Sequence, residues 1–154
     1  MRNKNQKSDN ILTGVAGEYL VAGELSKRGY IASVTLRNTR GVDILVSNRD
    51  ATKSVGIQVK TTTYSNTHSW VVDKKGENYY ADNLFYVFCN LRDGNVRPAF
   101  FIVPSKVVAK QIKQNHIGWM KRPNRAGGKH KDTPMRKFFD SEELYLEKWD
   151  ILNL

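Results

Sequence analysis

The sequence predicts a single α/β domain in which an N-terminal helix precedes a mixed β-sheet that is flanked by helices. Three observations lead to this class. The chain has 154 residues, a length that suits one domain with its own hydrophobic core. Apolar residues first recur at three- and four-residue spacing, and then gather in short runs between polar turns. Neither an internal repeat nor an interdomain linker divides residues 1–154.

The elements follow one another in a clear order along the chain. Residues 1–10 form a basic arm, and a helix is expected over residues 11–29, with Gly29 at the position of a C-cap glycine. A turn-rich basic loop over residues 121–137 precedes a last helix over residues 140–152, which Asp140 or Ser141 would cap. Strands are predicted over residues 30–36, 42–46, 55–60, 68–72, 84–91 and 99–103, and a further helix from 104 to about 115.

The charge balance restricts the class of partner. The chain has 25 Lys and Arg residues against 15 Asp and Glu, a net charge of +10, which favours a polyanion. Nucleic acid is the first candidate. An anionic membrane is a weaker one, because no helix combines a basic face with a broad apolar face that lacks a core to join. An acidic protein partner remains as an alternative.

The N-terminus and the single cysteine bear on the compartment. The first ten residues are polar and basic, and no apolar signal-peptide core follows them, so a cytoplasmic location is expected. Cys89 alone excludes an internal disulfide and a cysteine-based zinc cluster. It lies in an apolar run, which predicts a buried and inert thiol.

Two neighbouring strands carry polar side chains on a common face. Side chains alternate across a strand, so Asp43 lies opposite Ile44, and Gln58 and Lys60 share one face of the next strand. If the two strands form a hairpin, Asp43 lies beside Gln58 and Lys60. A solvent-exposed Asp43–Lys60 ion pair would explain the same pattern and stabilise by about 0–1 kcal/mol. Asp is disfavoured within strands, however, and this favours a functional role.

The first helix offers a third polar residue. On a helical wheel Glu18 falls between Leu25 and Ile11, within the apolar face of the helix. A carboxylate that points toward a sheet is costly unless it is paired or binds a metal. Gly14 and Gly17 flank Glu18, so the helix can approach the sheet closely there. The alternative is an ion pair of Glu18 with a Lys or Arg at the edge of the core.

These motifs, in this order, resemble those of the PD-(D/E)XK nuclease superfamily, which includes many restriction endonucleases and archaeal Holliday-junction resolvases. Gly17-Glu18 is similar to the helix glutamate of the resolvase-like branch. Gly41-Val42-Asp43 matches the metal-binding aspartate motif, and Gln58-Val59-Lys60 stands in the place of (D/E)XK. The glutamine departs from the commonest form but resembles the Mrr-like restriction group. The resemblance covers roughly residues 11–63.

The resemblance implies a restriction-endonuclease-like core and a metal-dependent DNA endonuclease that hydrolyses phosphodiester bonds. Glu18, Asp43 and Gln58 would bind Mg²⁺, with Mn²⁺ as a substitute, and Lys60 would assist the attacking water. Gln58 leaves two carboxylates rather than three, so an inactive nucleic-acid-binding module of the same fold is the alternative. A homodimer would suit cleavage of both strands of DNA.

Candidate DNA contacts lie on both sides of these motifs. They flank Asp43, follow Lys60, or lie in the basic loop, where cations can follow phosphates. A turn, the strand preference of threonine and a solvated loop explain the same residues without DNA. No phosphate-binding glycine loop is present, so ATP dependence is not expected. The candidates are Arg37, Arg40, Thr62, Lys121, Arg122, Arg125, Lys129 and Lys131.

Overall fold

The computed structural model describes residues 10–36, 40–63, 68–92 and 95–154. The predicted arm over residues 1–9 and the candidate DNA contact Arg37 lie outside these ranges. In chain order the elements are α1 (Asn10–Lys27), β1 (Ile31–Val34), β2 (Ile44–Ser47), β3 (Ser54–Thr62), β4 (Ser69–Asp73), the 3₁₀ helix η1 (Lys74–Asn78), β5 (Leu84–Asn90), β6 (Ala99–Pro104), α2 (Ser105–Lys121), β7 (Met135–Phe139) and the 3₁₀ helix η2 (Trp149–Leu152).

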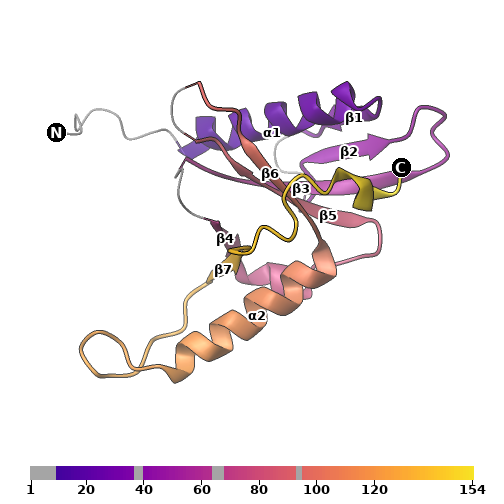
Figure 1. The fold of residues 1–154 in the computed structure, drawn as a ribbon. Helices are drawn as coiled ribbons and strands as arrows, with labels where there is room; N and C mark the ends of the chain where they lie inside the picture. Colours follow the sequence, from indigo (N-terminus) through magenta and orange to yellow (C-terminus); the bar gives the residue numbers. More distant parts are fainter. Residues whose placement is uncertain (1–9, 37–39, 64–67, 93–94) are drawn as a thin grey trace.

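The strands form two separate sheets. The larger has five strands in the order β1-β2-β3-β5-β6, in which β3 and β5 are parallel and the other pairs antiparallel. Strands β4 and β7 form a two-stranded antiparallel sheet, called here the ribbon. Helix α1 lies on one side of the five-stranded sheet, and the ribbon and α2 lie on the other (Figure 1). The predicted mixed sheet with flanking helices is thus confirmed.

The alternation of β3 divides the core into two layers. Val55, Ile57 and Val59 are buried on the side of α1, where they pack with Val21 and Leu25 of that helix. The opposite side of the sheet carries an aromatic layer in which Phe88 of β5 stacks on Phe138 of β7, with ring centroids 4.4 Å apart. Because both faces are covered, every residue of β5 is buried, and its Cys89 is a buried thiol whose pKa rises to about 12 through burial.

Gly17 is the point at which α1 comes closest to the sheet. A Cβ atom at this position would lie 1.9 Å from Oγ1 of Thr61, so only glycine fits without a shift of the helix. Gly14 has no atom within 4 Å of such a Cβ, so the expected close approach holds for Gly17 and not for Gly14. The contact places the middle of α1 against the end of β3 that follows Lys60.

The predicted C-terminal helix over residues 140–152 is wrong. The segment forms turns and ends in η2. Its backbone bonds to the edge strand β6: Ile102 N–H donates to Tyr145 O at 3.0 Å, and Glu147 N–H donates to Phe100 O at 2.8 Å. Asp140, expected to cap a helix, accepts from the N–H groups of Leu144 and Tyr145 and so holds a turn. Pairing with an open sheet edge outweighs local helix signals.

The predicted basic loop over residues 121–137 is partly wrong. Helix α2 extends to Lys121, beyond the predicted end near residue 115, and β7 takes the last residues of the expected loop. Arg136 is buried within β7, because its guanidinium pairs with Glu77 and donates to Thr133 O at 2.7 Å. In the described ranges, no helix is long and apolar enough to cross a membrane.

Candidate active site

The candidate site begins at the hairpin of β2 and β3. The register pairs Ile44 with Ile57, so Asp43, which immediately precedes β2, lies beside Gln58. Asp43 N–H donates to Ile57 O at 2.8 Å, and its Oδ2 accepts from Val59 N–H at 2.7 Å. The side chain thus bonds to the backbone of the neighbouring strand. The expectation that a hairpin brings Asp43 to Gln58 and Lys60 agrees with this arrangement.

The charge of Asp43 is incompletely compensated. Burial raises the pKa of its carboxyl group, and the Val59 N–H and the positive charge of Lys60 oppose that rise without cancelling it. A half-buried carboxylate of this kind is stabilised by any further cation that reaches it. Asp43 is therefore a suitable anionic donor for a metal ion.

A cavity of about 570 Å³, called here the site hollow, lies next to this hairpin. Asp43 is not among its lining residues, but its charge helps to raise the pKa of Tyr86, which is. The pKa of Tyr86 reaches about 12, first through burial and then through the nearby Tyr79, Asp43 and Asp73. The lining residues are Arg40, Gly41, Gln58, Lys60, Val72, Asp73, Lys75, Gly76, Asn78, Tyr79 and Tyr86.

Glu18 lies on α1, on the other side of the five-stranded sheet from the ribbon. It is half-buried and follows Gly17, whose contact with Thr61 fixes α1 at the end of β3. Glu18 was expected within the apolar face of α1. Because it is only half-buried, it lies at the margin of that face, and the buried Val21 and Leu25 form its centre. Glu18 does not line the site hollow, so the structure groups Asp43, Gln58 and Lys60 more closely with one another than with Glu18.

The donor set fits a hard divalent cation. Asp43 and Glu18 offer carboxylate oxygens, and Gln58 offers an amide oxygen; Mg²⁺ prefers such oxygen ligands and retains several waters. In the described part of the chain, no three His, Cys, Asp or Glu side chains gather as a metal cluster.

A second cavity, of about 460 Å³, adjoins the same strand end and is called here the strand-end hollow. Lys60 lines both hollows, so it stands between them. Thr62, a predicted DNA contact, lies in the strand-end hollow, and Arg40, another, lies in the site hollow. The strand-end hollow is lined by Asn10, Thr13, Lys60, Thr61, Thr62, Thr63, Ser69, Trp70, Val71 and Lys137.

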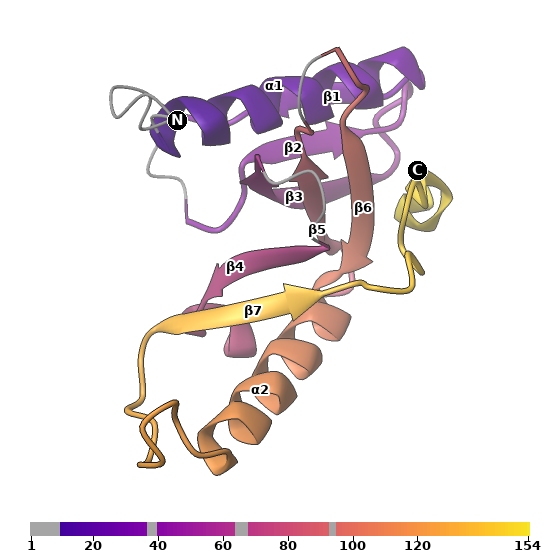
Figure 2. The same ribbon diagram turned by 60° about the vertical axis from the view of Figure 1, so that its left-hand side comes forward.

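The remaining predicted DNA contacts lie apart from both hollows. Lys121 ends α2, and the others follow in the connection to β7, which extends away from the sheet beyond α2 (Figure 2). All five are exposed, and none lines either hollow: Lys121, Arg122, Arg125, Lys129 and Lys131.

Sequence reasoning missed the second wall of the site hollow. Asp73 comes from the end of β4, Lys75 from η1, and Tyr79 directly follows η1, a segment brought there by the ribbon. Asp73 Oδ1 accepts from Lys75 N–H at 2.8 Å and so caps η1. The Asp73-Lys74-Lys75 run signals this cap, but no local pattern pairs β4 with the distant β7.

Comparisons with known proteins agree with this architecture. No family model and no curated protein matches the chain. Among solved structures, a bacterial homing endonuclease, I-Ssp6803I, superposes with a TM-score of 0.58 at 13% identity, over 94% of this chain and 93% of that one. A Holliday junction resolvase of Archaeoglobus fulgidus superposes with a TM-score of 0.40, also at 13% identity, over 79% of this chain and 86% of that one.

The homing endonuclease comparison covers nearly the whole of both chains and establishes the fold. The chain therefore shares the fold of this homing endonuclease, in agreement with the restriction-endonuclease-like core that the motif order predicts.

Proposed function

We propose that this protein is a metal-dependent DNA endonuclease that hydrolyses phosphodiester bonds at Asp43, Gln58 and Lys60, with Glu18 as a further ligand. The observation that carries the proposal is the joining of Asp43 to the β3 backbone beside Gln58 and Lys60. It occurs at a hollow large enough for a nucleotide, in a fold shared with a homing endonuclease.

The residues of the chain would divide the work as follows. Asp43, Gln58 and Glu18 would hold a divalent cation, Mg²⁺ or Mn²⁺, which when bound neutralises charge on the phosphate and lowers the pKa of water. Lys60 would orient the attacking water or accept its proton, and its positive charge would stabilise the phosphate as negative charge develops. Arg40 and Lys75, in the same hollow, would hold the neighbouring phosphate oxygens.

The geometry also explains how the protein would place Lys60. It lies on β3, where it pairs with Phe88 of β5, so its backbone is held by the parallel pair of central strands. Lys60 lies close enough to Asp43 for its positive charge to oppose the rise that burial causes in the pKa of the Asp43 carboxyl group. A rigid scaffold of this kind suits catalysis by positioning.

The test is cleavage of labelled linear duplex, single-stranded, supercoiled and four-way-junction DNA with Mg²⁺, Mn²⁺ or EDTA. The variants are Asp43→Ala and Lys60→Ala. Asp50→Ala and Lys53→Ala serve as controls, because they change the same residue types in the exposed turn of the same hairpin. Metal-dependent cutting that only the first two substitutions abolish supports the proposal.

The same assay separates the alternatives. Binding without cutting in either metal, unchanged by Asp43→Ala, would replace the nuclease by an inactive DNA-binding module of this fold. Absence of DNA binding at low salt would favour an acidic protein partner for the +10 charge. We further propose a homodimer, since cleavage of both strands needs two sites, and a cytoplasmic location.

A further inference from the structure

The ribbon of β4 and β7 has one covered face and one open face. Trp70, Val72, Arg136 and Phe138 are buried on its inner face, against the sheet and α2. Three apolar residues of the outer face remain exposed: Val71 by 53%, Met135 by 52% and Phe139 by 42% of their surface. The outer face consists of Ser69, Val71, Asp73, Met135, Lys137 and Phe139.

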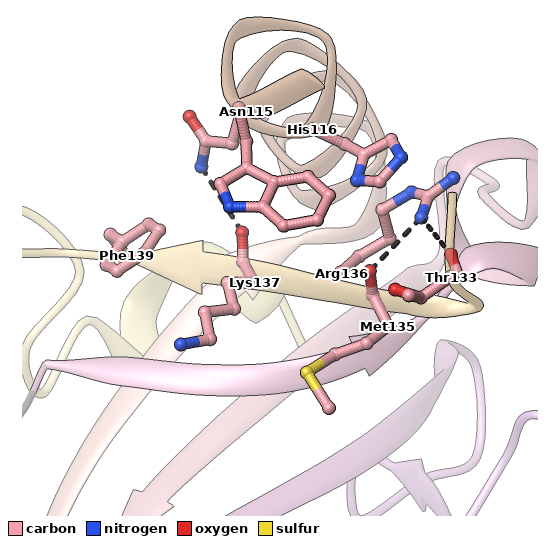
Figure 3. A pocket seen from close by; sticks show the side chains of 8 residues that line it. Asn115, His116, Thr133, Met135, Arg136, Lys137 and Phe139 are labelled. Carbon is pink, nitrogen blue, oxygen red and sulfur yellow. Dashed lines mark hydrogen bonds between the residues drawn. The ribbon is translucent and has the colours of Figure 1, made fainter. Parts of the chain in front are cut away.

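The ribbon is held rigidly along the β7 edge that faces away from β4. Gln111 of α2 donates to Phe139 O at 2.9 Å and accepts from Phe139 N–H at 2.8 Å. Asn115 donates to Lys137 O at 3.2 Å, as Figure 3 shows. These amides occupy the β7 edge, so that the open surface of the ribbon is its outer face and not this edge.

A hollow lies on each side of the outer face. On the β4 side is the strand-end hollow, which reaches Lys60. On the β7 side is a cavity of about 340 Å³ against α2, called here the helix hollow, which Trp119 helps to line. Its lining also includes His116 and Phe139 (Figure 3). Lys137 lines both, so it stands on a ridge between two depressions.

We propose that the ribbon inserts into the major groove of duplex DNA, a proposal that rests on the nuclease function above. The major groove is about 12 Å wide and admits a two-stranded β-ribbon. The two sugar–phosphate strands would then lie in the two hollows. The strand in the strand-end hollow passes Lys60 and is the one that is cut.

The charges and surfaces on both sides suit this occupant. Lys60 and Thr62 offer donors to phosphate oxygens in the strand-end hollow. The rings of Trp119 and Phe139 offer apolar contact to deoxyribose in the helix hollow, beyond which α2 ends in exposed cations. An acidic protein could use the charges, but the ridge between two hollows matches the shape of a grooved helix.

The outer face also determines which bases would be recognised. Val71 and Lys137 are direct partners in the ribbon register, at its centre. A lysine there donates to the O6 and N7 acceptors of guanine, and Val71 and Met135 contact thymine methyl groups. The protein would therefore prefer sites that combine these bases, and a change at residue 137 would relax the choice at one base pair.

The first experiment measures the affinity for one mixed-sequence duplex in three forms, with Ca²⁺ in place of Mg²⁺ to prevent cutting. The forms are unmodified DNA, DNA whose cytosines carry bulky glucosylated 5-hydroxymethyl groups in the major groove, and DNA covered in the minor groove by netropsin. The expected result is at least a tenfold rise (~1.4 kcal/mol) in Kd for the glucosylated duplex and less than about a twofold change with netropsin. The reverse order, or equal Kd values for all three, overturns the proposal.

The second experiment uses Lys137→Met and Val71→Glu, with Lys148→Met as the control for removal of an exposed lysine elsewhere. Both ribbon variants should bind unmodified duplex more weakly, and Lys137→Met should select altered sequences from a randomised duplex pool, while the control behaves as wild type. Equal selection by wild type and Lys137→Met contradicts the proposal.

Cleavage under saturating enzyme separates this proposal from the proposed function. Lys148→Met should cut plasmid DNA with Mg²⁺ at the wild-type rate, because Lys148 is exposed and lines neither the site hollow nor the two hollows beside the ribbon. A wild type that binds through the major groove but never cuts removes the nuclease and keeps the ribbon. A wild type that cuts but is insensitive to glucosylation removes the ribbon alone.

Discussion

The two faces of the five-stranded sheet differ although the same strand builds both. Toward α1, β3 presents Val55, Ile57 and Val59, and the layer is aliphatic. Toward the ribbon it presents Gln58 and Lys60, which line the site hollow. The period of two in a strand thus separates residues that stabilise the fold from the residues to which we assign the contact with substrate. A substitution on one face should leave the property of the other face unchanged.

A pair of substitutions on β3 should give the largest effects and tests whether its two faces affect stability and cleavage separately. Ile57→Ala removes a fully buried side chain and should lower the free energy of unfolding by about 3 kcal/mol, with cleavage per folded molecule unchanged. Lys60→Met should lower the cleavage rate about a hundredfold or more, with stability nearly unchanged. Urea unfolding and single-turnover cleavage measure the two effects. A Lys60→Met protein that cuts normally would contradict the division.

Gly17 tests how α1 is held on the structural face. Gly17→Ala places a Cβ against Thr61 Oγ1, so the helix must shift, and the free energy of unfolding should fall by about 1–3 kcal/mol. Gly14→Ala is the matched control, because the space there is open and alanine favours a helix. Adding Thr61→Ala should recover part of the stability, since it removes the clashing hydroxyl, which has no hydrogen-bond partner in the described structure. Thermal unfolding of the four proteins tests this, and no recovery in the double variant would count against the contact.

Substitutions of Gln58 test whether this residue of β3, on the face toward the ribbon, binds the metal ion. Gln58→Glu adds a third carboxylate and should lower the Mg²⁺ concentration for half-maximal cleavage by about tenfold, because ligand charge raises cation affinity. The comparison uses Gln58→Ala, which should raise that concentration. Equal Mg²⁺ requirements in the three proteins would exclude residue 58 from the site.

The raised pKa of Asp43 leads us to expect that the stability of the protein depends on pH. Its pKa is raised in the folded protein above 3.8, so ionisation costs stability as the pH rises from about 3.8 through the folded pKa, and the cost is absent at lower pH. In EDTA, Asp43→Asn should therefore be more stable relative to wild type at pH 7 than at pH 3. Denaturant unfolding across this range measures the difference, and a difference that stays constant with pH would refute the assignment.

The exposed cations beyond α2 should give the smallest effect. Lys129→Gln with Lys131→Gln should lower the slope of log affinity against log salt by about one for each phosphate that these lysines neutralise, with saturated cleavage unchanged. Lys53→Gln with Lys148→Gln, an equal change of charge on exposed residues elsewhere, is the control. Equal slopes in both double variants would show that the loop does not bind DNA.

The parts of the structure that the sequence predicted are those set by local patterns. Asp43, Gln58 and Lys60 come together because a short hairpin and strict alternation leave them one arrangement. The ribbon escaped prediction because residues 69–73 and 135–139 are distant in the sequence, and neither strand carries a signal for its partner. The C-terminal segment has good helix caps, yet its backbone pairs with the open edge of β6. Glu18 is an intermediate case: the helical wheel predicted its face, whereas its depth depends on how closely Gly17 approaches Thr61.

Single-turnover cleavage of supercoiled plasmid by wild type and Asp43→Asn, each with Mg²⁺ and with EDTA, tests the central claim most directly. Asparagine keeps the size of the side chain and an oxygen for the Val59 N–H, and removes only the charge. We predict Mg²⁺-dependent cutting by wild type that falls about a thousandfold in the variant. Equal cutting by both proteins, or wild-type cutting that persists in EDTA, would contradict the claim.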